Sequence, residues 1–418
     1  MVSAVTDLLV PQLTSVWGII FFIILVIIYG FGLYAILTFL RHNTREIREK
    51  NPQVKRVDAM IIISQVVLLA LVFLILFTIL IDSKYYTAYI LTASLVSEPI
   101  TVIISVLFAK TFFSWYRSNK SSIIVLLYGV SFAIAAFAIA EVTILDIAAL
   151  IDKPPIIDSK SEVVFPSDVY EPGTAPRIAS DTYRYAGIAA FIFVLAATAL
   201  LLKSFSKKIG SVKYWILILL PLLYYFTTLL DNFGIYVPET DTEFLNWYLY
   251  SSLNSTAGGV LFGIAFWQVA KSIRQNHVVR TYMRIAAYGF ILYFITNQVG
   301  LSAASYPPLG IAAFSLLGLS TYMVFLGVYS SAVSISQDIQ LRKSIRKLAA
   351  GDKNLLSSIG TAYMDQEIQR TVKSMKGVVE QQEKELEEQT GIEANLEEDE
   401  MKNYLEQVMQ EVGKSRKA

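Results

Sequence analysis

The chain of 418 residues contains no cysteine and only two histidines, His42 and His277. The missing cysteines exclude disulfide bonds, thiolate metal ligands and cysteine nucleophiles. Both histidines fall in charged connecting segments, so no apolar segment offers an axial ligand to a haem, and the pattern argues against a b-type cytochrome. We expect neither a metal nor a cofactor.

Motifs that signal catalysis are also missing from the sequence. It has no phosphate-binding glycine loop, no metal-binding histidine pair and no serine elbow. The C-terminal tail lacks histidine, so it cannot be the phosphoacceptor helix of a histidine kinase. A formal net charge of +1 gives no basis for binding nucleic acid. We therefore expect a protein that is not an enzyme and that does not bind nucleic acid.

Charge is scarce and apolar residues are abundant. Only 17% of the residues are charged, against 55% hydrophobic ones, whereas soluble domains carry about a quarter charged residues. Long apolar runs predict membrane spans, and lipid forces such spans to be helical. The sequence thus predicts an all-α polytopic bundle over residues 1–333. Its nine spans are expected at 17–40, 57–81, 86–114, 121–151, 184–205, 213–236, 245–270, 282–303 and 309–333.

The orientation of the bundle follows from the positions of Lys and Arg. Seventeen of the 35 lie in four connections on one side, and five lie in segments on the other, which include the proline-rich loop 152–183. Cytoplasmic connections are the more basic ones, so we expect a multi-pass cell-membrane protein with an extracellular N-terminus and a cytoplasmic C-terminus.

The remaining thirteen Lys and Arg lie in a patterned tail. Residues 334–350 form a predicted basic juxtamembrane helix, which turns Arg342, Lys343, Arg346 and Lys347 toward anionic headgroups. A helical tail over 351–418 follows, in which Gly351 and Gly360 are expected to break the helix. Apolar residues in 368–386 keep the spacing of a short coiled coil. This segment predicts either a homodimer or a cytoplasmic protein partner.

Four acids lie inside the apolar runs: Glu98, Glu141, Asp146 and Asp231. An ionised acid in lipid costs on the order of 2.5–3.5 kcal/mol, and none of the Lys or Arg lies deep in a span. Each acid must therefore be protonated, face water or meet a bound cation. For Asp146 and Asp231, which lie near the outer interface, plain solvation is the favoured interpretation.

A polar pocket in the outer half of the bundle is the functional hypothesis. Its candidate residues are Glu98, Glu141, Asp231, Asn254, Asn297 and Gln298, with Glu98 nearest the midplane beside Pro99. Such a pocket suits a cation, a proton or a small amine ligand from outside. The alternative for the amides is ordinary hydrogen bonding between helices. For the small residues Gly258, Gly259 and Gly263, close helix packing is the favoured interpretation over a ligand site.

Apolar spans followed by the junction Ser334–Leu348 and by heptads resemble the membrane input modules of prokaryotic multi-pass sensors. The layout also resembles archaeal multi-pass membrane proteins of unassigned function. The resemblance implies a signal relay from the outer pocket to the tail, with output through a partner because the chain carries no output enzyme. Two alternatives stay open: a secondary transporter or channel that uses the intramembrane acids, and a scaffold subunit of a membrane complex.

Overall fold

The computed structural model describes most of the chain. The described residues are 15–82, 88–118, 120, 122–152, 174–232, 260–273, 277–302, 307–337, 355–356 and 358–370. Within these ranges every regular element is a helix, and no strand occurs. The predicted all-helical membrane architecture is therefore confirmed.

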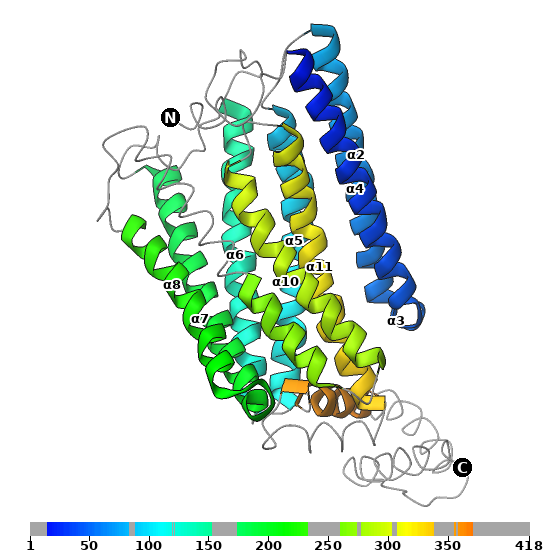
Figure 1. Cartoon of the computed structure of the whole chain (residues 1–418), viewed down its shortest axis with the longest axis vertical. Coiled ribbons are helices and arrows are strands. Elements are labelled where there is room, and N and C mark those ends of the chain that lie inside the picture. Colours follow the sequence, from blue (N-terminus) through cyan, green and yellow to red (C-terminus); the bar gives the residue numbers. More distant parts are fainter. Residues whose placement is uncertain are drawn as a thin grey trace, which may run out of the picture.

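Long helices run side by side along the length of the molecule (Figure 1). They are α2 (Val16–Asn43), α3 (Arg45–Lys50), α4 (Pro52–Asp82), α5 (Ala88–Ser118), α6 (Ile123–Asp152), α7 (Ala175–Ile209), α8 (Ser211–Asn232), α10 (His277–Ser302) and α11 (Pro307–Gln337). A further apolar helix, Val260–Ser272, lies between α8 and α10 in the sequence.

Seven of the described helices are long and apolar enough to cross a membrane. They match the first five and the last two of the nine predicted spans. The apolar parts of the sixth and seventh, Ser211–Leu222 and Val260–Ser272, are shorter than a full crossing within the described residues. The count of nine spans and the direction of the termini therefore stay predictions.

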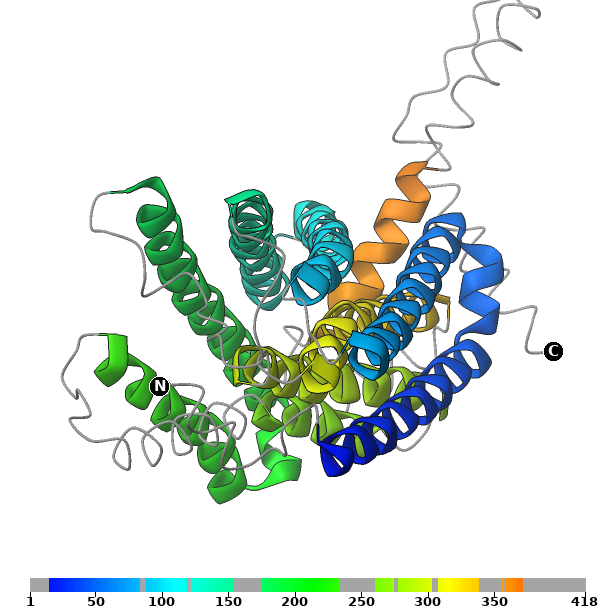
Figure 2. The ribbon, with the colours of Figure 1, turned by 90° about the horizontal axis from the view of Figure 1, so that it is seen from above.

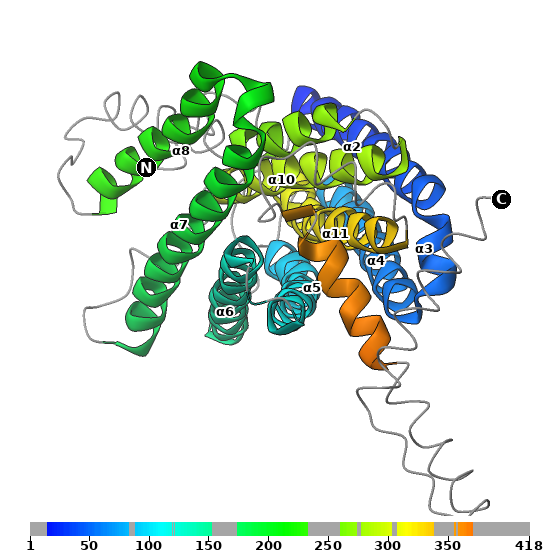
Figure 3. The same cartoon turned by 90° about the horizontal axis from the view of Figure 1, so that it is seen from below.

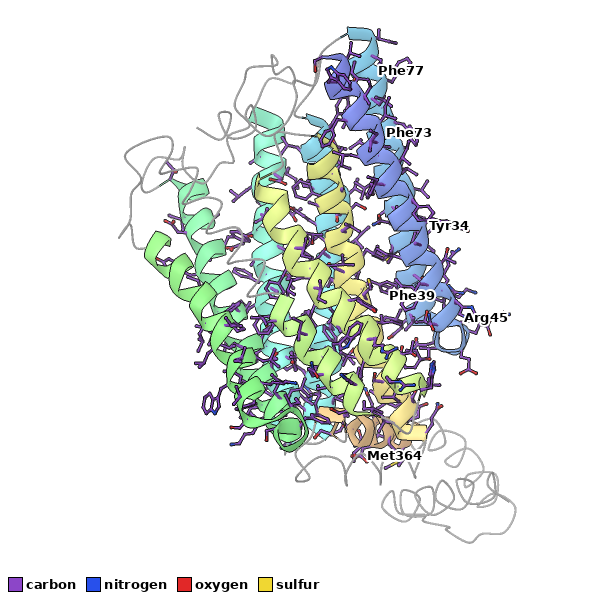
Figure 4. The ribbon with its side chains drawn as sticks, viewed as in Figure 1. Tyr34, Phe39, Arg45, Phe73, Phe77 and Met364 are labelled. Atoms are coloured by element: carbon purple, nitrogen blue, oxygen red, sulfur yellow. The ribbon has the colours of Figure 1, made fainter. Side chains whose placement is uncertain are left out.

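Helix α11 lies at the centre of the bundle. In its most apolar stretch 78% of the residues are buried, against 17% in α2, and it contacts α10, α5, α4 and α2. Figure 2 shows α11 enclosed by other helices, with α2 and α4 on one outer side of the bundle. On α2 and α4, the side chains of Tyr34, Phe73 and Phe77 point away from the bundle, and they are more than half exposed (Figure 4). These side chains suit contact with lipid.

Glycine allows α10 and α11 to approach closely. A Cβ atom added at Gly327 would lie 2.5 Å from the Tyr282 carbonyl oxygen, and one at Gly289 would lie 2.7 Å from the Val324 nitrogen. Gly263 meets α10 in the same way, with Ile291 as its neighbour. The packing role predicted for Gly263 is confirmed, whereas Gly258 and Gly259 lie outside the described residues.

A short helix at residues 355–356 and 358–370, here named the tail helix, lies across one end of the bundle (Figures 1 and 3). Leu355, Leu356, Ile359 and Ile368 are buried there. Gly360 lies within this helix, so the break predicted at Gly360 is wrong. The glycine is needed for packing instead, because an added Cβ would lie 2.4 Å from Ile335 Cγ2.

Candidate functional site

Two of the intramembrane acids meet where α5 packs on α6. Glu98 of α5 is 3% exposed and accepts a hydrogen bond of 3.0 Å from Thr143 of α6. Asp146 of α6 is 5% exposed and accepts a hydrogen bond from Ser94 of α5. The solvation expected for Asp146 is wrong, because its carboxyl is covered by α5 and bonded to it. We name Glu98 and Asp146 the acidic pair.

Helical spacing places these groups opposite each other. Ser94 and Glu98 lie four residues apart on α5, and Thr143 and Asp146 lie three apart on α6, so each pair occupies one face of its helix. The two helices run in opposite directions, and each contributes one acid and one hydroxyl. Helix α5 continues through Pro99 from Ala88 to Ser118.

Electrostatics make the acidic pair costly. Their hydrogen bonds hold both carboxyls at the same contact between α5 and α6, where two charged carboxylates repel each other. Within the described ranges no Lys or Arg forms an ion pair with either acid. Two neighbouring carboxylates in an apolar layer are tolerated only with a proton, water or a cation between them. The pair can thus respond to protons or cations, although no group of three or more potential metal ligands occurs among the described residues.

The other predicted pocket residues do not join this pair as far as the structure describes them. Glu141 is partly exposed, and its buried Oε2 atom has no hydrogen-bond partner among the described residues. Asp231 lies on α8, and Asn297 and Gln298 lie on α10, with their side chains outside the described set. Asn254, and the basic residues Arg342, Lys343, Arg346 and Lys347, also lie outside the described residues.

Hydrogen bonds continue from the acidic pair to α11. Ser97, next to Glu98, donates to the carbonyl oxygen of Phe314 on α11. Gly318 of α11 allows α11 to approach α5 closely, since an added Cβ would lie 3.3 Å from Thr101 Oγ1 of α5. One residue after Phe314, Ser315 accepts a hydrogen bond of 2.6 Å from Tyr29 of α2. The contacts of Ser97 and Gly318 hold α11 against the α5 face that carries Glu98, and the Tyr29 hydrogen bond joins α2 to α11.

Buried Gln65 of α4 completes this arrangement. Its amide nitrogen donates to the Ser315 carbonyl oxygen at 3.0 Å, and its amide oxygen accepts from the Ser315 hydroxyl. Sequence reasoning missed Gln65 and Ser315. The sequence shows Gln65 as a single amide inside a long apolar run, but it does not indicate which residue the amide binds.

The opposite end of α11 contacts the tail helix. Tyr329 accepts a hydrogen bond of 2.5 Å from Asn51, and its ring meets Tyr363 of the tail helix edge to face at 5.9 Å. Gln366 donates to Ser114 of α5 at 2.8 Å. A hydrogen-bonded contact thus links the tail helix to α5, and ring and backbone packing link it to α11.

Ion pairs brace the same end of the bundle. Arg48 of α3 donates to Asp58 of α4 at 3.2 Å, and Tyr322 of α11 donates to the other Asp58 oxygen at 3.3 Å. Nearby, the exposed Arg45 guanidinium donates to Glu49 and lowers the pKa of that carboxyl. Water screens the Arg45–Glu49 pair, so it adds little to stability. Asp58 is the structural anchor because it joins three helices.

Comparison with protein-family models, with curated proteins and with solved structures found no match for this chain. Its function must therefore be argued from its own residues.

Proposed function

We propose that the protein is a membrane signal relay in which α11 carries a change at the acidic pair to the tail helix. The observation that carries this proposal is the position of α11. Near one end its Phe314 carbonyl accepts a hydrogen bond from Ser97, the neighbour of Glu98. At the other end its Ile335 packs against Gly360 of the tail helix. One helix therefore contacts both the input site and the output segment.

A physical mechanism supports this relay. A proton or cation that reaches the acidic pair removes the repulsion between Glu98 and Asp146, and α5 and α6 then come closer. Because Ser97 is bonded to α11, a shift of α5 moves α11 with it. Packed interiors respond by switching between arrangements rather than by bending smoothly. Because Ile335 packs closely against Gly360, a movement of α11 also moves the tail helix.

Distance measurements between two labels test the relay. The chain has no cysteine, so Lys55→Cys on α4 and Gln369→Cys on the tail helix introduce the only thiols. Both positions are exposed. We expect that Glu98→Gln and Asp146→Asn each change the distribution of distances between spin labels in lipid nanodiscs, because each removes the repulsion permanently. Lowering the pH should produce the same change in the labelled protein that keeps both Glu98 and Asp146.

Glu49→Gln is the matched control, since it removes an exposed carboxylate whose ion pair is with Arg45 on the same short helix, α3. It should leave the distance distribution unchanged. The relay is refuted if Glu98→Gln and Asp146→Asn give the same distance distribution as the labelled parent protein and that distribution does not change with pH.

One observation favours transport as a second candidate function. The acidic pair is buried among apolar side chains without a basic partner in the described part of the chain, as expected for a proton or cation carrier. A transporter should move protons or cations into proteoliposomes, and Glu98→Gln should abolish that flux. A flux that survives Glu98→Gln would exclude this use of the pair.

A further inference from the structure

A cavity of about 490 Å³ lies between the tail helix and the end of the bundle. It is walled by α3, the start of α4, α5, α10, α11 and the tail helix, at the end seen in Figure 3. Binding sites for small molecules commonly enclose about 300–1,000 Å³. This cavity is separate from the acidic pair, because no residue of the pair lines it.

Two helical faces supply much of its polar lining. Lys110 and Ser114 lie one turn apart on α5, and Tyr363, Gln366 and Arg370 follow the same spacing on the tail helix. Gln366 donates a hydrogen bond to Ser114 across this gap. The cavity therefore lies beside the contact between α5 and the tail helix.

Two positively charged and two negatively charged side chains line the cavity, so its charges are balanced in number. Lys110 and Arg370 come from α5 and the tail helix, and Glu46 comes from α3 and lines the cavity together with Tyr282 of α10. The other lining acid, Glu367, lies 3.9 Å from Arg370 on the same helix. Neither Lys110 nor Glu46 has an ion-pair partner within the described ranges.

We propose that this cavity binds a zwitterionic headgroup that carries a phosphate and a primary ammonium. Lys110 and Arg370 would receive the phosphate, with the Ser114 hydroxyl as a further donor. Glu46 would receive the ammonium, and Tyr282 lines the cavity beside it. Such a molecule neutralises both sides without adding net charge, whereas a simple anion or cation would leave one side unpaired.

Two sources present this chemistry at a membrane surface: the headgroup of phosphatidylethanolamine and a soluble phosphoethanolamine. Either one would bridge α5 and the tail helix, because Lys110 lies on α5 and Arg370 lies on the tail helix. A bound headgroup thus stabilises the docked tail helix. This site goes beyond the proposed relay, since binding here does not require a signal from the acidic pair.

Calorimetry on the full-length protein in nonionic detergent tests the soluble arm, with O-phosphoethanolamine and inorganic phosphate as the two probes. Hydrogen exchange in nanodiscs tests the lipid arm, comparing phosphatidylglycerol alone with phosphatidylglycerol that contains phosphatidylethanolamine. We expect phosphoethanolamine to bind more tightly than phosphate, or phosphatidylethanolamine to slow amide exchange in residues 358–370. A response in one arm only identifies the source.

Variants that remove a positive or a negative charge distinguish binding in this cavity from nonspecific electrostatic binding to the protein surface. Lys110→Gln and Glu46→Gln should each weaken binding about tenfold, because each leaves one end of the headgroup unpaired. Lys55→Gln and Glu49→Gln remove exposed charges that do not line the cavity, and they should leave binding unchanged.

Three results would overturn the proposal. The first is no response in either arm. The second is equal affinity for phosphate and phosphoethanolamine, which would show that the ammonium is not recognised. The third is unchanged binding in both Lys110→Gln and Glu46→Gln, which would place the ligand elsewhere. The relay is tested with Glu98→Gln and Asp146→Asn, neither of which lines the cavity, so its failure and the failure of this site are distinguishable.

Discussion

At the scale of single residues, Gly360 shows how one missing side chain holds an interface together. Its substitution by Ala would bring a Cβ within 2.4 Å of Ile335 Cγ2 and 3.0 Å of Ile335 Cβ. Ile335 is fully buried on α11 and cannot move aside freely. Sequence reasoning treated this glycine as a helix breaker, which is the usual role of glycine when no partner surface is known.

We predict that Gly360→Ala undocks the tail helix. Overpacking of this kind costs about 1–3 kcal/mol, more than the gain in helix propensity from Ala. Amide hydrogen exchange in residues 358–370 should become faster. Gly30→Ala in α2 is the matched control, because nothing lies within 4 Å of the added Cβ. Unchanged exchange in Gly360→Ala would contradict the close packing with Ile335.

Asp146 marks the limit of prediction at this scale. Its place near the end of an apolar run was visible in the sequence, but burial depends on which face of α6 meets α5. A shift of one residue moves a helical side chain by about 100° around the axis, so the position of a run cannot decide it. Glu98 lies well inside its run, so the sequence marked it as an intramembrane acid, but the sequence did not identify its hydrogen-bond partner Thr143 on α6.

At the scale of elements, the pairing of α10 with α11 is fixed by backbone proximity. An added Cβ at Gly327 would lie 2.5 Å from the Tyr282 carbonyl oxygen and 2.6 Å from the Ala286 nitrogen. Backbone atoms within a helix cannot rotate away as a side chain can. The whole of α10 would have to move to admit one methyl group.

Gly327→Ala should therefore lower the melting temperature of the protein in detergent. We expect a loss of about 1–3 kcal/mol, since both helices must separate. Gly187→Ala in α7 is its control, because nothing lies within 4 Å of its added Cβ. That variant should melt at the same temperature as the parent chain or higher. Equal melting temperatures for the parent and Gly327→Ala would show that α10 and α11 are less tightly packed.

Helix type and approximate position were predictable for most elements, because lipid leaves apolar runs little choice but to form helices. The tail helix was not predictable in its docked position. The buried face of that helix, which includes Leu355, Ile359 and Ala362, has ordinary helical spacing that suits a coiled coil, a membrane surface or a bundle end equally well. Only the contacts with Ile335, Tyr329 and Ser114 decide among them.

At the scale of the whole molecule, the tail helix closes the end of the bundle. Truncation after Gln337 removes the buried side chains of Leu355, Leu356, Ile359 and Ile368 and exposes the surface they cover. Burial of one such side chain stabilises a protein by about 1.5–3 kcal/mol. We predict that this truncation lowers the melting temperature and increases binding of a dye that reports exposed apolar surface.

Truncation after Arg370 is the control, because it retains the tail helix and removes only the residues that follow. It should melt like the full chain and bind no more dye. If both truncated proteins behave like the full chain, the tail helix does not stabilise the bundle.

The docked tail helix also has a consequence for biogenesis. It is synthesised after α11, and its contacts lie on α5 and α11, which are far apart in the sequence. It can dock only once these helices have been inserted and assembled. Docking therefore marks the completion of assembly, and a chain with a misplaced span would leave the apolar face of this helix uncovered for chaperones and proteases to recognise.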